Sequence, residues 1–132
     1  MVKRFLLFTG FCLLIAGCGG VVTNILDARL DGGKTVIIND GALNRQITFG
    51  EIRMNGAEVQ VELQNKARRD VNFEYRFIWY DSSGVEISTI TNWNPAVLTG
   101  GETRGFKSTQ PSEAASGYKM MIRSPHEITP FN

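Results

Sequence analysis

Few residues in this sequence could carry chemistry. The single histidine, His126, lies in a proline-flanked tail, where nothing would hold it in a serine–histidine–aspartate triad. Asp81 stands where a nucleophile elbow around Ser83 would need a glycine. Asp81 and Glu86 flank one hairpin and could act as an acid–base pair or hold Ca²⁺, but such carboxylates more often bind the turn backbone. Metal sites built from histidine and cysteine are excluded by count. We therefore expect a protein that is not an enzyme and binds no cofactor or metal.

The two cysteines have a different chemistry, because one of them ends an apolar run. Two basic residues precede residues 5–15, which are too short to span a bilayer (about 20 residues) and have the length of a signal sequence. The run ends in Ile15-Ala16-Gly17-Cys18, which resembles the lipobox of bacterial lipoproteins. The resemblance implies cleavage between Gly17 and Cys18, a diacylglyceryl group on the Cys18 sulfur and an acyl chain on its amino group.

Cleavage at this point would decide both the compartment and the remaining chemistry. Cys12 would leave with the signal peptide (residues 1–17) and Cys18 would be alkylated, so the folded body would contain no thiol, which suits an oxidising compartment. Gly19 follows the cysteine in place of the aspartate common in lipoproteins of the inner membrane, which implies the periplasmic face of the outer membrane. With 14 basic and 13 acidic residues, the chain has no basic field for nucleic acid.

The rest of the chain has the pattern of an antiparallel β protein. Alternating apolar residues between turn signals predict about six or seven strands, at 35–38, 47–54, 58–64, 71–81, 85–90, 104–110 and 118–123. This spacing predicts one β-sandwich domain over residues 34–123, with 18–33 as lipidated N-terminus and short tether and 124–132 as a tail.

Local signals refine this pattern and leave some elements open. Gly50 predicts a bulge, and Asn55-Gly56 predicts a type I′ hairpin turn. Residues 21–33 could form a short helix or a first strand. Residues 91–102 contain a proline and are expected to be irregular.

Residues 71–81 are predicted to be the central strand, with one aromatic face and one mixed face. The inward face is expected to hold Val71, Phe73, Tyr75, Phe77 and Trp79. On the other face, Ile78 and Tyr80 would be covered by segment 21–33 or would form a patch for a partner. Trp93 would either plug one end of the sandwich or lie in a binding loop. The basic cluster at 66–70 would be a solvated turn or a contact for anionic lipid or glycan.

Several stretches together resemble the YcfL family of small bacterial lipoproteins. They are the lipobox, VELQN at 61–65, YRFIWYDSSGVEI at 75–87, Trp93, TGGET at 99–103 and STQPSEA at 108–114. The resemblance implies an immunoglobulin-like antiparallel β-sandwich that is lipid-anchored in the periplasm of Gram-negative bacteria. It implies no activity, because none is established for the family.

Two functions follow as hypotheses. The first is a non-enzymatic module at the outer membrane that binds an envelope protein through Trp93, Tyr80 and Ile78. The alternative is a module that binds peptidoglycan, in which Trp93 and Tyr80 stack on sugar rings.

Overall fold

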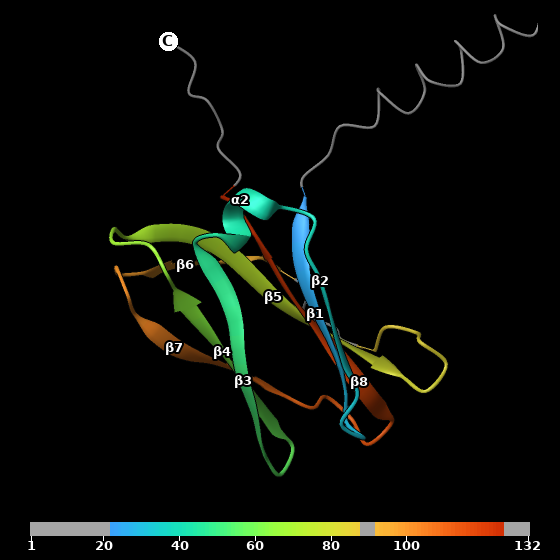
Figure 1. The fold of residues 1–132 in the computed structure, drawn as a ribbon. Helices are drawn as coiled ribbons and strands as arrows, with labels where there is room; N and C mark the ends of the chain where they lie inside the picture. Colours follow the sequence, from blue (N-terminus) through green and yellow to red (C-terminus); the bar gives the residue numbers. More distant parts are fainter. Residues whose placement is uncertain (1–21, 88–91, 126–132) are drawn as a thin grey trace, which may run out of the picture.

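The computed structural model describes residues 22–87 and 92–125, which form eight strands and one helical turn (Figure 1). Cys18, Gly17 and His126 lie outside these ranges. The strands are β1 (Thr23–Arg29), β2 (Lys34–Ile37), β3 (Ile47–Asn55), β4 (Glu58–Asn65), β5 (Val71–Asp81), β6 (Asn94–Leu98), β7 (Thr103–Thr109) and β8 (Ala115–Arg123), and the helix is α2 (Gly41–Asn44). Within the same ranges, no helix is long and apolar enough to cross a membrane.

The strands form two packed antiparallel sheets, so the predicted β-sandwich is confirmed. The larger sheet has the order β2-β1-β8-β5-β6 and the smaller one β3-β4-β7 (Figure 1). Phe73 of the larger sheet packs edge-on against Phe106 of the smaller one, with ring centroids 5.9 Å apart. The Trp79 indole donates a hydrogen bond of 2.8 Å to the Ser108 hydroxyl and so joins the sheets a second time.

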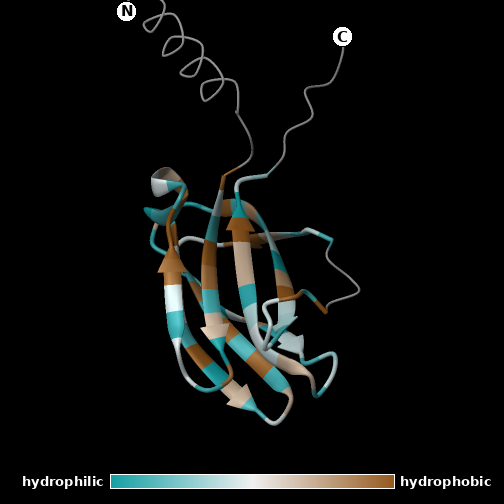
Figure 2. Cartoon of the chain, turned by 90° about the vertical axis from the view of Figure 1, so that its right-hand side faces the viewer, coloured by the Kyte–Doolittle hydropathy of each residue, from teal (hydrophilic) through white to brown (hydrophobic). Residues whose placement is uncertain are grey.

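The two faces of β5 differ as its sequence predicts. Val71, Phe73 and Trp79 are buried, and Tyr75 and Phe77 pack against the same core. The alternation of hydrophobic and hydrophilic residues continues along neighbouring strands (Figure 2). It follows that the other face of β5, which carries Ile78 and Tyr80, is the outer face of the larger sheet.

The tether expected over residues 18–33 is wrong for residues 23–29. These residues form β1, which pairs with β8 over its whole length, from Thr23 opposite Arg123 to Arg29 opposite Gly117. The first-strand alternative for this segment is therefore confirmed. Leu26 and Ala28 are buried on the inner face of β1, and burying a leucine side chain contributes about 2 kcal/mol. This gain holds β1 in the sheet rather than in solvent.

Two further local expectations are corrected. Residues 94–98, expected to be irregular, form β6, and Pro95 is tolerated because β6 is an edge strand that needs no amide there. The short helix α2 is capped by Asp40, whose side chain accepts from the Leu43 amide at 3.1 Å. Of the strand expected at 85–90, residues 85–87 form only a bridge between Glu86 and Tyr80, and residues 88–90 lie outside the described ranges.

The hairpin between β3 and β4 also differs from expectation. Asn55 pairs with Glu58, so the loop residues are Gly56 and Ala57. Only Gly56 has a positive φ, 63°, as in a type II′ turn rather than type I′. The bulge predicted at Gly50 is confirmed by the register shift between Phe49 and Ile52.

One end of the sandwich is held by a buried polar side chain in addition to strand pairing. Asn65, the last residue of β4, is fully buried. Its amide nitrogen lies 2.9 Å from the carbonyl oxygens of Arg69, Leu98 and Thr99, and its oxygen accepts from the Ala67 amide at 2.8 Å. These bonds satisfy backbone groups at the point where β4, β5 and β6 diverge.

Replacing Asn65 should therefore be costly. We expect Asn65→Ala to lower the free energy of unfolding by about 2–4 kcal/mol, because several buried backbone groups lose their partners at once. Urea denaturation measures the change. The matched control is Asn72→Ala, at an exposed position on β5, which should change stability by less than about 0.5 kcal/mol. Equal effects of the two substitutions would contradict this role of Asn65.

Candidate functional site

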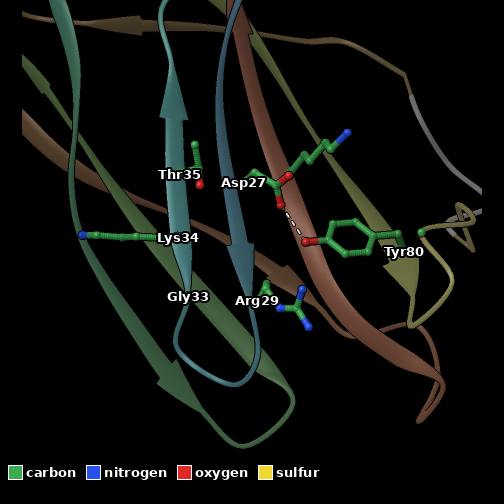
Figure 3. Close-up of a pocket in the computed structure, with 8 residues that line it drawn as sticks. Asp27, Arg29, Gly33, Lys34, Thr35 and Tyr80 are labelled. Carbon is green, nitrogen blue, oxygen red and sulfur yellow. Dashed lines mark hydrogen bonds between the residues drawn. The ribbon is translucent and has the colours of Figure 1, made fainter.

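A hollow of about 550 Å³ lies on the outer face of the larger sheet, at the end that holds the β1–β2 hairpin (Figure 3). Its lining comes from β1, the hairpin, β2, β8 and the end of β5. The residues are Asp27, Arg29, Gly33, Lys34, Thr35, Tyr80, Gly84 and Lys119. We call this the outer-face hollow. Of the residues singled out from the sequence, it contains Tyr80.

Tyr80 is held by a contact that spans three strands. Its hydroxyl donates a hydrogen bond of 2.6 Å to Asp27 Oδ1 on β1, across the intervening strand β8 (Figure 3). The ring can cross because the β8 residue beneath it is Gly117, which pairs with Tyr80 in register. A Cβ atom at position 117 would overlap the phenol ring and lie 2.8 Å from the Ala28 carbonyl oxygen. Gly117 is therefore needed for the close approach of the ring to the sheet.

Charges of both signs surround the Tyr80–Asp27 pair. Arg29 forms an exposed ion pair with Asp31, at 3.4 Å, and Lys119 lies in the lining. The Lys34 side chain extends away from the pair (Figure 3). Burial and the hydrogen bond to Asp27 raise the pKa of Tyr80 from 10 to about 12. The phenol is thus a neutral, fixed hydrogen-bond donor at physiological pH.

Ile78 lies beside the outer-face hollow, in a smaller depression of about 210 Å³ that shares Tyr80, Gly84 and Lys119 with it. Ile25 and Met121 supply the rest of its apolar wall. Segment 21–33 was one expected cover for Ile78 and Tyr80. That alternative is wrong, because residues 23–29 extend the sheet sideways instead of crossing its face. Both side chains are partly exposed.

Trp93 lies elsewhere on the same face and is not a core plug. Its ring is partly exposed and lies over two guanidinium groups, with Arg76 at 4.8 Å and Arg123 at 4.0 Å from the ring centroid. Arg123 also donates to Glu74 at 2.7 Å. Since Arg123 pairs with Thr23, Trp93 belongs to the end where the chain enters the fold, opposite to Tyr80.

Of the carboxylate pair considered from the sequence, Asp81 binds the backbone of its own turn. Asp81 Oδ1 accepts from the amides of Ser83 and Val85 at 2.9 and 3.0 Å, and Glu86 is exposed. The charged residues of the basic cluster at 66–70 are exposed in the β4–β5 connection. Over residues 22–87 and 92–125, no three acidic, histidine or cysteine side chains come together as a metal site would need.

Sequence reasoning missed the partners of Tyr80. Asp27 and Arg29 lay in a segment read as a tether, and no local pattern sets Lys119 apart from the other lysines. The one available signal was Gly117, because a glycine next to a strand pattern often marks a close approach to its backbone. Gly117 was left outside the strand predicted at 118–123.

The fit of Tyr80 over Gly117 can be tested by a double-mutant cycle. We expect Gly117→Ala to lower the free energy of unfolding by about 1–3 kcal/mol, because the added methyl group displaces the ring. In a Tyr80→Ala background the same substitution should cost less, since only the approach to the Ala28 carbonyl remains. Thermal and urea unfolding of the four proteins give the coupling, and strict additivity would contradict the contact.

The hydrogen bond itself has a pH signature. Tyr80→Phe should cost about 1 kcal/mol of stability at neutral pH. Because the folded-state pKa of Tyr80 is raised from 10 to about 12, this difference should be complete below pH 10 and should disappear as the pH rises to about 12. Urea titrations at a series of pH values test this. A difference that grows with pH would show that Tyr80 does not donate to Asp27.

Comparisons with known proteins give a family but no activity. A crystal structure of a DUF1425 family member from Shewanella sp. pv-4 resembles this fold with a TM-score of 0.52 and 16% identity, over 83% of this chain and all of that one. A crystal structure of Campylobacter jejuni cj0090 has a TM-score of 0.46 and 13% identity, over 61% of this chain and 84% of that one. No curated protein matches the sequence. The family model for proteins of unknown function DUF1425 matches residues 34–124. Because that match covers most of the chain, the protein belongs to the DUF1425 family.

Proposed function

We propose that this protein is a lipoprotein anchored to the outer membrane through Cys18, and that its β-sandwich is a non-enzymatic module that binds a protein of the periplasm or envelope. The lipobox-like sequence before Cys18 and the resemblance to YcfL-type lipoproteins support the anchor. Membership of a family without established activity is compatible with a binding role. The location of the outer-face hollow is the observation that carries the proposal.

The hollow lies at the end of the sandwich opposite to the proposed anchor. Thr23 is five positions after Cys18, so at most about 17 Å of chain separates them. Thr23 and Arg123 are cross-strand partners, so the chain enters and leaves at one end. Arg29, in the hollow, is at the far end of β1, about 20 Å away at strand spacing. An anchored sandwich would therefore present the hollow toward the periplasm.

The side chains of the hollow suit a protein surface. Tyrosine and arginine are over-represented among the residues that dominate protein interfaces. Tyr80 is already fixed by Asp27 and Gly117, so little rotamer entropy would be lost when a partner covers it. Arg29 and Lys119 could each pair with an acidic group of that partner.

The glycan alternative has weaker support. Stacking on a sugar needs an open aromatic face. Trp93 already lies over Arg76 and Arg123, and Tyr80 covers Gly117 with one face.

The anchor can be tested by mass and fractionation. We expect the protein from Gram-negative cells to begin at Cys18, to carry the mass of the diacylglyceryl and acyl groups, and to sediment with the outer membrane. Cys18→Ala should move it to the soluble fraction, because two or more acyl chains are needed for stable anchoring. Unmodified protein in the soluble fraction of wild-type cells would contradict the anchor.

The binding role can be tested by photo-cross-linking in living cells. A photoreactive residue at position 119, in the hollow, should give one discrete protein adduct, and the same residue at position 72 should not. Arg29→Glu should reduce the yield at least several-fold, and Cys18→Ala should abolish it. Recovery of glycan in place of protein would support the alternative, and no adduct at position 119 would contradict both.

A further inference from the structure

The outer edge of the larger sheet at β2 is open. β2 pairs only with β1 among the described residues, and all four of its residues are exposed. Val36, Ile37 and the following Ile38 expose 46%, 44% and 40% of their surface. Three consecutive exposed aliphatic residues on both faces of an edge strand are unusual, because such an edge can pair with another chain.

The hydrogen-bonding groups of this edge can be assigned from the hairpin. The Arg29 amide donates to Gly33 at 2.7 Å, and the next amide, Leu30, donates the other way, to Ser116 on β8, at 2.9 Å. Backbone groups alternate in direction along an antiparallel strand. In β2, Thr35 and Ile37 therefore face β1, and Lys34 and Val36 direct their N–H and C=O groups outward.

The three other sheet edges carry features that block such pairing. β6 contains Pro95, which lacks an amide. β3 is interrupted by the bulge at Gly50 and carries Glu51 and Arg53. β7 carries Arg104 and Lys107. β2 carries a charge only at its first residue, Lys34, and has no proline or bulge, so among the described edges it is the one most open for pairing.

A second hollow lies beside this edge, between the two sheets. We call it the β2–β3 slot; it has a volume of about 460 Å³. Its apolar lining is Ala28, Leu30, Ile52, Met54 and Tyr118, and its polar lining is Arg29, Gly32, Gly33, Lys34 and Glu51. Met54 is 49% exposed, so the slot is open to solvent.

Tyr118 gives the slot a hydrogen-bonding requirement. The residue is 1% exposed, and its hydroxyl has no hydrogen-bond partner in the described part of the chain. Leaving a buried hydroxyl without a partner is costly. A group that enters the slot and bonds this hydroxyl would remove that cost. The slot therefore fits an apolar occupant that also carries one hydrogen-bonding atom.

We propose that an extended segment of a partner protein, apolar at alternate positions, pairs with the outer edge of β2 and inserts side chains into the β2–β3 slot. Lys34 and Val36 supply the backbone bonds. Val36 lies opposite the buried Leu26, so its side chain is on the inner face of the larger sheet. Side chains on the same face of the added strand would therefore lie against Ile52 and Met54 in the slot. A hydrogen-bonding side chain among them reaches Tyr118. This recognition combines strand addition with pockets for alternate residues.

A second copy of this chain is a poorer occupant, an argument that rests on the proposed anchor. Antiparallel pairing of two β2 strands would point the two N-terminal ends in opposite directions. With Val36 opposite its own copy, the two Thr23 residues would be about 20 Å apart along the strands. With the strands upright on the membrane, as the proposed anchored sandwich requires, the farther Thr23 would lie beyond the reach of a tether of at most about 17 Å.

The test is a selection with a defined probe. A phage-displayed library of eight-residue peptides is panned on the intact chain in detergent. We expect recovered peptides to alternate apolar and polar residues and to slow hydrogen exchange at the Lys34 and Val36 amides. Val36→Pro should weaken their binding at least tenfold. Val97→Pro is the matched control. Val97 lies on the opposite edge strand and is 41% exposed, close to the 46% of Val36. It is two residues after Pro95, so its amide has the same direction as that of a proline that β6 already tolerates.

Further variants keep the result interpretable. If Val36→Pro lowers the melting temperature more than Val97→Pro, Val36→Lys replaces it, since it keeps the amide and adds charge above the slot. Tyr118→Phe should weaken binding about 2- to 10-fold, the value of one hydrogen bond, without lowering the melting temperature.

Three results would overturn the proposal. One is that Val36→Pro and Val97→Pro bind the peptides equally. Another is that recovered peptides lack alternation. The third is a dimer of the Cys18→Ala chain that Val36→Pro dissociates, which would assign the edge to a second copy. Peptide binding needs no lipid, so a fractionation result that rejects the anchor would leave the strand-addition proposal standing.

Discussion

The pairing of β1 with β8 is the interaction on which the rest of the structure depends. Seven consecutive residues of β1 pair in register with β8, and two of them, Leu26 and Ala28, are buried in the core. This pairing brings Asp27 within reach of Tyr80, carries the hairpin that separates the two hollows, and leaves β2 as an open edge. It also fixes Thr23 beside Arg123, so the described chain begins at the end of the sandwich opposite to the outer-face hollow. The family match begins at Lys34, after this strand.

Much of the sandwich could be predicted from the sequence, because alternation decides which side of a strand is buried. The inward aromatic face of β5 and the bulge at Gly50 follow from residues a few positions apart. The site could not be predicted in the same way. Tyr80 depends on a glycine 37 positions later and an aspartate 53 positions earlier. Register between distant strands decides such contacts, and local pattern does not encode it. The expectation that residues 91–102 are irregular was wrong for a related reason. A proline excludes a central strand but not an edge strand, and local sequence does not show which strand is at the edge.

The β1–β2 hairpin gives the protein two surfaces of different chemistry. Arg29, Gly33 and Lys34 line both hollows. The outer-face hollow has a fixed tyrosine and charges of both signs, whereas the β2–β3 slot is lined mainly by apolar side chains and holds one hydroxyl without a partner. A protein that contacts the hairpin could use both surfaces at once, and linking two weak contacts in this way raises overall affinity without any new contact.

Hydrogen exchange at the amides of Leu26 and Ala28 in the intact chain tests the account most directly. These amides face β8, because Leu30, two residues further, donates to Ser116. If β1 is an integral strand, these amides should exchange as slowly as the amides of β8, because exchange would then require global unfolding. Exchange at the rate of an unprotected amide would mean that β1 is a tether. The outer-face hollow, the β2 edge and the opposed anchor would then all be lost together.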